Sequence, residues 1–166
     1  MSDPVILMDL DDTLYAYGPC NEAGLAAAYH VSQQVCPRVE QACFMALHDE
    51  VRGHWARELP GNASSHNRVL FFKAMVERWV DARQIDAFDA GLVLDLDRAY
   101  WEAFLGAIQG GPDMISVLTT LTPRYRLALV TNQVAETQLK KISALGIAGF
   151  FAAIVTSEEA GIEKPG

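Results

Sequence analysis

The chain has 166 residues, which is enough for one sizeable hydrophobic core or for a core with a small inserted module. Hydrophobic residues make up 51% of the sequence and charged residues 20%, a composition that excludes a disordered chain. The net charge is −8, and no cluster of Lys and Arg is present to neutralise a phosphate backbone. The composition therefore argues against nucleic acid as a partner.

The first predicted element is a strand over residues 5–8. Four consecutive apolar residues between Pro4 and Asp9 are typical of a strand that is buried on both faces of a parallel sheet. The run is too short for a secretory signal, and no stretch approaches the roughly 20 apolar residues that span a bilayer. We therefore expect a cytoplasmic protein with no membrane partner.

The sequence from about residue 21 to residue 108 favours helices, because its apolar residues recur at helical spacing and no strand pattern is convincing. The candidate helices are 21–34, 38–57, 66–82 and 95–108. Aromatic residues at this spacing are expected to form the core of the block: Trp55, Phe71, Phe72, Trp79, Trp101 and Phe104. The cysteines, an odd number without CxxC spacing, are expected to be free thiols: Cys20, Cys36 and Cys43.

Helices and strands alternate after this block. Helices are predicted over 113–121 and 134–145, and strands over 126–130 and 151–155, whose apolar runs are again typical of burial on both faces. Gly146 follows the second helix in the position where a left-handed residue ends a helix. The alternation predicts an α/β fold with a parallel sheet and right-handed crossovers. A helical insertion after the first strand, where α/β active sites form, predicts a cap over the site.

Two aspartates follow the first strand directly. Asp9 and Asp11 are two residues apart, so in extended chain both side chains point toward the carboxyl end of the sheet. Two carboxylates so close repel unless a cation lies between them, and Mg²⁺ prefers such oxygen ligands together with phosphate and water. Asp9 could attack phosphorus as a nucleophile, and Asp11 could exchange protons with the leaving alcohol and with water. An isolated pair would more often cap a turn, but the preceding apolar run and Thr13 favour the catalytic interpretation.

Two further positions could hold phosphate oxygens. Thr131 and Asn132 follow the strand 126–130 at the start of a helix, where a hydroxyl and backbone N–H groups can bind an anion. Taken alone, they would more often cap that helix. Lys164 follows the last strand and could neutralise both the nucleophile and the transferred phosphoryl group, although a single lysine is usually solvated.

A second Asp-Leu-Asp sequence repeats the pattern of an apolar run followed by paired acids. Asp95 and Asp97 follow Leu92–Leu94, but Ala99 stands where the threonine is expected. The sequence then continues as an amphipathic helix with Asp95 near its N-cap. We interpret this second pair as structural.

Three segments together resemble the haloacid dehalogenase superfamily. Val5 through Thr13 is similar to its motif I, an apolar run followed by DxDxT. Leu127 through Asn132 resembles motif II, and Glu158 through Pro165 resembles the surroundings of motif III, which places the family lysine at Lys164. The helical insertion resembles the C1 cap of the phosphatase-like subfamily.

The resemblance implies a role for each residue. Asp9 is then the nucleophile and a metal ligand, and Asp11 is the general acid and base and offers its backbone carbonyl to Mg²⁺. Thr131 and Lys164 are expected to bind the phosphoryl group, with Asn132 assisting through its backbone. An aspartate at position 11 favours phosphate chemistry, because dehalogenases that attack carbon lack it. The expected function is a Mg²⁺-dependent phosphatase acting on a small phosphorylated metabolite.

The resemblance also divides the chain. Residues 1–16 and 109–166 are expected to form a Rossmann-like core, and residues 17–108 a helical C1-type cap. The family continues with a fourth motif of paired acids and two more strands that are absent here, so we expect a truncated chain of low activity. The strand at 5–8 would then be an apolar sheet edge through which copies could self-associate.

Alternative functions share parts of this pattern. A phosphomutase would use the same two aspartates but return the phosphoryl group to a sugar. A non-catalytic interaction protein of the same fold would lack metal chemistry altogether. A phospho-receiver domain does not fit the sequence, because such a domain has no long helical insertion after its first strand. His66 or Arg68, at the start of a cap helix, could contribute to substrate choice by binding an anionic or polar group of the substrate. Solvated side chains at a capped helix start are the more frequent case.

Overall fold

The computed structural model describes residues 4–165, and the chain divides into two compact units. One unit contains the residues up to Cys20, Gly61–Ser64 and the chain from Leu105 onward. The other contains Asn21–Pro60 and Ser65–Phe104. We refer to them as the sheet unit and the helical unit. The predicted division into a core and a cap at residues 17 and 108 stays a prediction.

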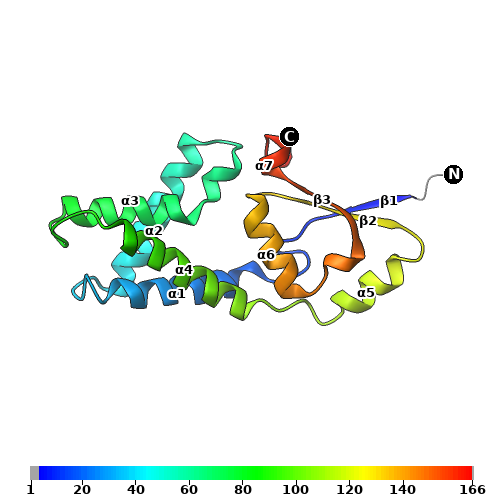
Figure 1. Ribbon diagram of the computed structural model, residues 1–166, viewed down its shortest axis with the longest axis horizontal. Coiled ribbons are helices and arrows are strands. Elements are labelled where there is room, and N and C mark those ends of the chain that lie inside the picture. The colour runs from blue at the N-terminus through cyan, green and yellow to red at the C-terminus, as the bar shows by residue number, and fades with distance from the viewer. Residues whose placement is uncertain (1–3, 166) are drawn as a thin grey trace. The chain divides into compact units, whose positions relative to one another are not determined.

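The sheet unit is built on three parallel strands, β1 (Val5–Met8), β2 (Arg126–Thr131) and β3 (Phe151–Thr156), in the order β1-β2-β3 (Figure 1). Helices α5 (Met114–Leu121) and α6 (Ala135–Leu145) precede and follow β2, which confirms the predicted α/β fold class and its alternation. Helix α6 ends at Gly146, whose φ of 68° is the left-handed conformation expected there. A short 3-10 helix, η2 (Ala148–Phe150), leads into β3, and a short helix, α7 (Ser157–Ala160), follows it.

Burial differs among the three strands. Only β2 is buried along most of its length, whereas Val5 and Leu7 of β1 are 57% and 68% exposed and most of β3 is half-buried or exposed. The expectation that all three strands are buried on both faces is therefore wrong for β1 and β3. The physical reason is their position, because in the described sheet each has a neighbouring strand on one side only.

The helical unit consists of α1 (Tyr17–Ser32), which begins in the sheet unit, and of α2 (Gln41–Glu58), α3 (Arg68–Asp81) and α4 (Ala90–Ala107), with the 3-10 helix η1 (Ala63–His66) before α3. Its core is largely aromatic, and of the six aromatic residues predicted there Phe71, Phe72, Trp79 and Phe104 are buried, whereas Trp55 and Trp101 are only half-buried. The rings of Phe72 and Tyr100 lie 6.1 Å apart, and those of Phe44 and Trp79 lie 6.3 Å apart. Helices α1 and α4 approach closely at Gly24, where an added Cβ would lie 2.9 Å from the carbonyl oxygen of Tyr100. Glycine is the residue that this crossing permits.

The second Asp-Leu-Asp sequence lies inside α4, which begins five residues before Asp95. Asp95 forms an ion pair with Arg98 on the exposed side of the helix, and the first turn is capped instead by Asp89, whose carboxylate accepts from the backbone N–H of Gly91 at 2.7 Å. The expected N-cap role of Asp95 is therefore wrong. The apolar residues 92–94 belong to the amphipathic helix itself.

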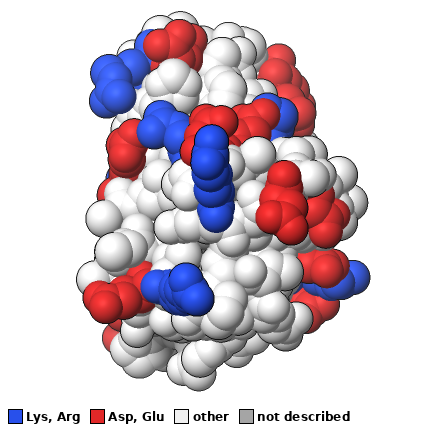
Figure 2. Space-filling view, turned by 90° about the vertical axis from the view of Figure 1, so that its left-hand side faces the viewer, with Lys and Arg blue, Asp and Glu red and all other residues white. Residues whose placement is uncertain are grey.

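Charged residues are interspersed rather than gathered on the face shown in Figure 2, where acidic and basic side chains lie next to one another. Some charged residues of the chain form ion pairs along one helix, such as Lys73 and Glu77, whose Nζ and Oε1 atoms lie 2.5 Å apart. Among the described residues, no helix combines the length and the apolar character that a membrane span requires.

Candidate active site

Asp9 follows the carboxyl end of β1 in the sheet unit. Its side chain is 44% exposed, and its Oδ1 accepts a hydrogen bond from the backbone N–H of Leu10 at 2.7 Å. The Nζ of Lys164 lies 2.7 Å from the same oxygen. Both contacts involve Oδ1, so in the part of the chain that the structure describes Oδ2 is the oxygen placed to meet another ligand. A half-exposed carboxylate beside a lysine can act as a nucleophile toward an anionic group.

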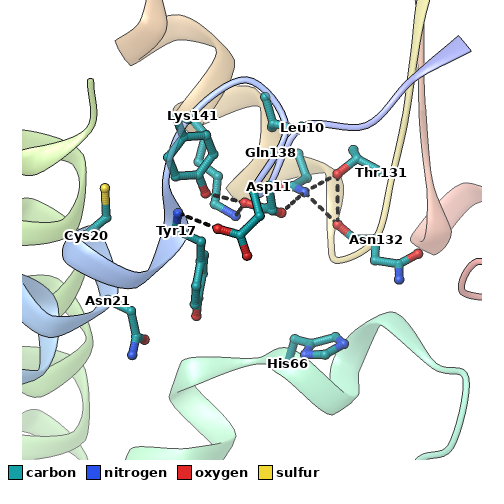
Figure 3. Close-up of polar contacts among 12 residues, drawn as sticks. Leu10, Asp11, Tyr17, Cys20, Asn21, His66, Thr131, Asn132, Gln138 and Lys141 are labelled. Atoms are coloured by element: carbon teal, nitrogen blue, oxygen red, sulfur yellow. Dashed lines mark hydrogen bonds and ion pairs between the residues drawn. The ribbon is translucent and has the colours of Figure 1, made fainter. Parts of the chain in front are cut away.

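Asp11 occupies a different environment, in which its carboxylate is held by three side chains (Figure 3). The Nζ of Lys141 lies 2.7 Å from Oδ1, and the Nε2 of Gln138 donates to Oδ2 at 3.0 Å. The hydroxyl of Tyr15 also donates to Oδ1. Because the carboxylate is engaged by protein donors, the backbone carbonyl of Asp11 is the group that could reach a metal ion. The role of Asp11 as a metal ligand stays a prediction.

The pKa of the Asp11 carboxyl is set by opposing effects. Burial raises it, but the charge of Lys141 and the hydrogen bonds from Lys141, Tyr15 and Gln138 outweigh burial, so the pKa lies below its usual value. Burial, followed by the neighbouring Asp11 charge, raises the pKa of the Tyr15 hydroxyl, which therefore stays protonated as a donor. The carboxylate is ionised at neutral pH.

Thr131 is the last residue of β2 and is buried. Its Oγ1 lies 2.5 Å from the Nε2 of Gln138, which also donates to the backbone carbonyl of Asn132 at 2.7 Å (Figure 3). Gln138 thus connects the end of β2 to Asp11. The side chain of Asn132 points to the third motif instead, because its Oδ1 accepts from the backbone N–H of Lys164 at 2.9 Å.

Lys164 completes the arrangement from the far end of the chain. Besides its pair with Asp9, its Nζ donates to the backbone carbonyl of Val130 at 2.8 Å. The segment that carries it is tied to the loop after β2, since the hydroxyl of Ser157 accepts from the backbone N–H of Gln133 at 2.9 Å. A cavity of about 150 Å³ lies between these segments and is lined in part by Thr131, Ser157 and Lys164.

The structure therefore brings all five predicted site residues into the sheet unit, at the carboxyl ends of the strands. They form two groups. In the first, Lys164 contacts both Asp9 and Asn132. In the second, Gln138 hydrogen-bonds to both Asp11 and Thr131. Their catalytic and binding roles stay predictions. Within residues 4–165, no group of three or more His, Cys, Asp or Glu side chains is arranged to hold a metal.

The sequence analysis missed Gln138, Lys141 and Tyr15. A signal was available in α6, where the inward positions 138, 141 and 142 are separated by helical spacing, yet two of the three carry polar residues. Both of those side chains are completely buried. A glutamine and a lysine on the buried face of a helix that begins at a predicted phosphate site indicate partners in that site.

Of the two cap residues considered for substrate choice, Arg68 is placed within the helical unit. It is 5% exposed, and its guanidinium lies 5.0 Å and 5.1 Å from the ring centroids of Phe71 and Tyr100. Its Nη1 donates to the backbone carbonyl of His66 at 2.9 Å. Arg68 is a buried part of the aromatic core rather than the solvated helix start that the sequence favoured.

Known proteins are similar to this chain in sequence and in fold. Residues 4–166 match the family model described as haloacid dehalogenase-like hydrolase. The ribulose-1,5-bisphosphate 5-phosphatase of Halopiger xanaduensis is 35% identical over 161 residues, which cover 96% of this chain and 65% of that protein. The glyceraldehyde 3-phosphate phosphatase of Methanothermobacter thermautotrophicus is 26% identical over 163 residues, with the same coverage.

A solved structure of the HAD-hydrolase YfnB from Bacillus subtilis, bound to magnesium, has the same fold. It aligns with a TM-score of 0.65 at 20% identity, over all of this chain and 70% of YfnB. The chain spans about 65% of the length of the curated relatives that it matches. The match over residues 4–166 shows that the chain belongs to the haloacid dehalogenase-like hydrolase family.

Proposed function

We propose that this chain carries the catalytic core of a Mg²⁺-dependent phosphatase that hydrolyses a small phosphorylated metabolite through an aspartyl-phosphate on Asp9. The observation that carries the proposal is that the two aspartate carboxylates lie in different environments. Asp9 is half-exposed beside Lys164, whereas Asp11 is buried in a network of donors. Two carboxylates in such different environments can take different roles in one reaction.

In the first half of the proposed reaction, a carboxylate oxygen of Asp9 attacks phosphorus and the bond between phosphorus and the alcohol oxygen breaks. Lys164 and Thr131 stabilise the charge on the phosphoryl oxygens. The leaving oxygen takes a proton through Asp11, and a singly ionised phosphate ester brings that proton into the site. In the second half, ionised Asp11 accepts a proton from water as the water attacks phosphorus and the bond between phosphorus and Asp9 breaks. Asp11 then passes this proton to the departing phosphate and is ionised again.

Mg²⁺ fits this donor set, because one open carboxylate oxygen, a backbone carbonyl, substrate phosphate and water are the oxygen ligands that it prefers. Asp9 would hold it through its side chain and Asp11 through its backbone. The bound ion would supply positive charge that screens the phosphoryl group from the attacking carboxylate. The magnesium-bound YfnB, a relative in fold, supports the choice of metal.

The substrate belongs to the same proposal. The two curated relatives are named for phosphorylated sugars, ribulose 1,5-bisphosphate and glyceraldehyde 3-phosphate, so a phosphorylated sugar is the substrate class that we assign. Residues 17–108 would serve as a C1-type cap that selects it, and residues 1–16 and 109–166 as the core. A cytoplasmic protein that acts on a small molecule, rather than on nucleic acid or a membrane, is also part of the proposal, because the sequence contains no cluster of basic residues.

The test measures release of inorganic phosphate from both sugar phosphates with Mg²⁺ present. Asp9→Asn should reduce activity to background, and removal of Mg²⁺ by a chelator should do the same. Asp95→Asn is the matched control, since it makes the same change in the other Asp-Leu-Asp sequence and should leave activity intact. Activity that survives Asp9→Asn would overturn the proposal. Transfer of the phosphoryl group to a second sugar position, without release, would identify a phosphomutase instead.

Self-association is a separate part of the proposal. The outer edge of β1 is unpaired among the described strands, and Val5 and Leu7 expose apolar side chains beside it. Such an edge can pair with the same edge of a second copy. Leu7→Lys should then shift the molecular mass measured by light scattering toward the monomer, and an unchanged mass would contradict the pairing.

A further inference from the structure

Lys141 is a buried charge that the proposed reaction does not yet use. Its side chain is 0% exposed, and its Nζ lies 2.7 Å from the Oδ1 of Asp11. The rings of Tyr15 and Tyr17 lie 6.0 Å and 5.7 Å from the same nitrogen. A lysine is almost never completely buried unless a partner requires it there, because removing its charge from water is costly. The partner here is the proposed acid and base.

Gln138 holds the other oxygen of the same carboxylate. Its amide nitrogen lies within 3.0 Å of three oxygens, which belong to Asp11, Thr131 and the backbone of Asn132. The carboxylate and the carbonyl can only accept, so the NH₂ group of Gln138 must face them. The hydroxyl of Thr131 accepts from the same amide and donates to the backbone carbonyl of Asn132 at 3.5 Å.

Both residues stand on one face of α6, three positions apart, and that helix is fixed at the end nearest the site. The backbone N–H of Ala135 in its first turn donates to the carboxylate of Glu158 at 2.9 Å. Helix α6 thus presents two donors, on a rigid frame, to the two oxygens of one carboxylate. A third donor, the hydroxyl of Tyr15, restricts rotation of the carboxylate further.

We infer that Lys141 and Gln138 are positioning residues, which hold the Asp11 carboxylate in the orientation that proton transfer to the leaving group requires. The inference rests on the proposed function and deepens it. It differs from a purely structural role for the ion pair, in which Lys141 and Asp11 only stabilise the fold. The two roles predict different responses to the leaving group of the substrate.

The experiment compares glyceraldehyde 3-phosphate, whose leaving alkoxide must be protonated, with 4-nitrophenyl phosphate, whose leaving phenolate is already stabilised. We use kcat/KM, because it reports only the steps up to formation of the aspartyl-phosphate. Lys141→Met should lower kcat/KM for the alkyl ester by on the order of 10²-fold, and for the aryl ester by less than about tenfold. A misfolded site would lower both values by the same factor.

Lys140→Met is the matched control. Lys140 is the adjacent residue of α6, is half-exposed and pairs with Glu136 at 2.7 Å, so its replacement removes the same charge from the same helix. Both values of kcat/KM should stay within about twofold of wild type. Gln138→Met is the second variant, since it keeps the charge pair and therefore the fold. It should give a smaller loss, again selective for the alkyl ester.

Each outcome is decisive. A selective loss in Lys141→Met or Gln138→Met supports the positioning role. Equal losses on the two esters, or no loss in a folded variant, overturn it while leaving the proposed function intact. If Lys141→Met does not fold, as judged by circular dichroism, Gln138→Met decides alone. An unmutated chain that hydrolyses neither ester refutes the proposed function and, with it, the inference.

Discussion

The two units of the molecule differ in what they bury. The helical unit buries mainly large aromatic side chains, among them Phe44, Phe72 and Tyr100, together with a few polar groups such as His48 and Arg68. The sheet unit buries polar side chains near the carboxyl ends of its strands, namely Thr131, Gln138, Lys141, Thr156 and Ser157. Buried aromatic groups mainly contribute to stability, whereas buried donors hold charges in fixed places. The comparison indicates that substitutions in the helical unit should chiefly change stability, and those near the strand ends chiefly chemistry.

The largest expected effect is on chemistry. Lys164→Met removes the charge beside Asp9 and should lower kcat/KM by on the order of 10²–10³-fold, the loss typical of a removed donor that stabilises transition-state charge. The thermal midpoint should change little, because both partners of this pair are partly exposed. Lys73→Met, which breaks the exposed pair with Glu77 in the helical unit, is the control and should leave kcat/KM unchanged.

The next effect is on stability. Phe72 is completely buried in the helical unit, so Phe72→Ala should lower the free energy of unfolding by about 3–5 kcal/mol. Urea denaturation at constant temperature measures the change. Phe88→Ala, at an aromatic residue that is 46% exposed, should cost far less. Similar losses at both positions would contradict the assignment of Phe72 to the core.

A smaller loss is expected where α1 crosses α4. The Cβ of Gly24→Ala would lie 2.7 Å from ring carbons of Tyr100 and 2.9 Å from its backbone oxygen, and a backbone atom cannot rotate away. Overpacking of this kind typically costs about 1–3 kcal/mol. Gly18→Ala on the same helix meets nothing within 4 Å and should not destabilise. Equal unfolding midpoints for the two variants would show that the crossing is looser than described.

The smallest expected effect depends on pH. Burial, followed by the charge of Arg68, lowers the pKa of His48 from 6.5 to about 4 despite the opposing effect of Asp49. Between these values the unfolded chain binds a proton that the folded chain does not, so stability should fall as the pH falls from 6.5 toward 4. The loss is at most about 1.4 kcal/mol for each pH unit.

His48→Gln should flatten this dependence in urea denaturation measured at pH 5 and pH 7. His54→Gln, at an exposed position of the same helix, should leave the dependence as in the wild type. An unchanged slope in His48→Gln would show that other groups cause the acid sensitivity.

Much of the fold could be predicted from the sequence. The strands at 126–130 and 151–155 are each one residue longer in the structure, and Gly146 ends α6 as expected, because apolar runs and helix ends are local signals. The start of α4 was harder to predict from the sequence. Its first turn is capped by Asp89, and the apolar run that follows resembles a strand when read alone.

The partners of the site were harder to predict. The order of the motifs placed Asp9, Thr131 and Lys164 at one edge of the sheet, because parallel strands end at the same edge. That argument does not specify which carboxylate each lysine meets. The pairing of Asp11 with Lys141 joins residues 130 positions apart and depends on how α6 is rotated on its axis, which the sequence indicates only through polar residues on a buried face.

In the proposed reaction, Asp9 carries the phosphoryl group during turnover. The most direct measurement is acid-quench mass spectrometry with 4-nitrophenyl phosphate, using Asp11→Asn to slow hydrolysis of the intermediate. A single phosphoryl group is expected on the peptide that contains Asp9, and none when Asp9→Asn is added. A phosphoryl group on any other residue, or turnover without a covalent intermediate, would contradict it.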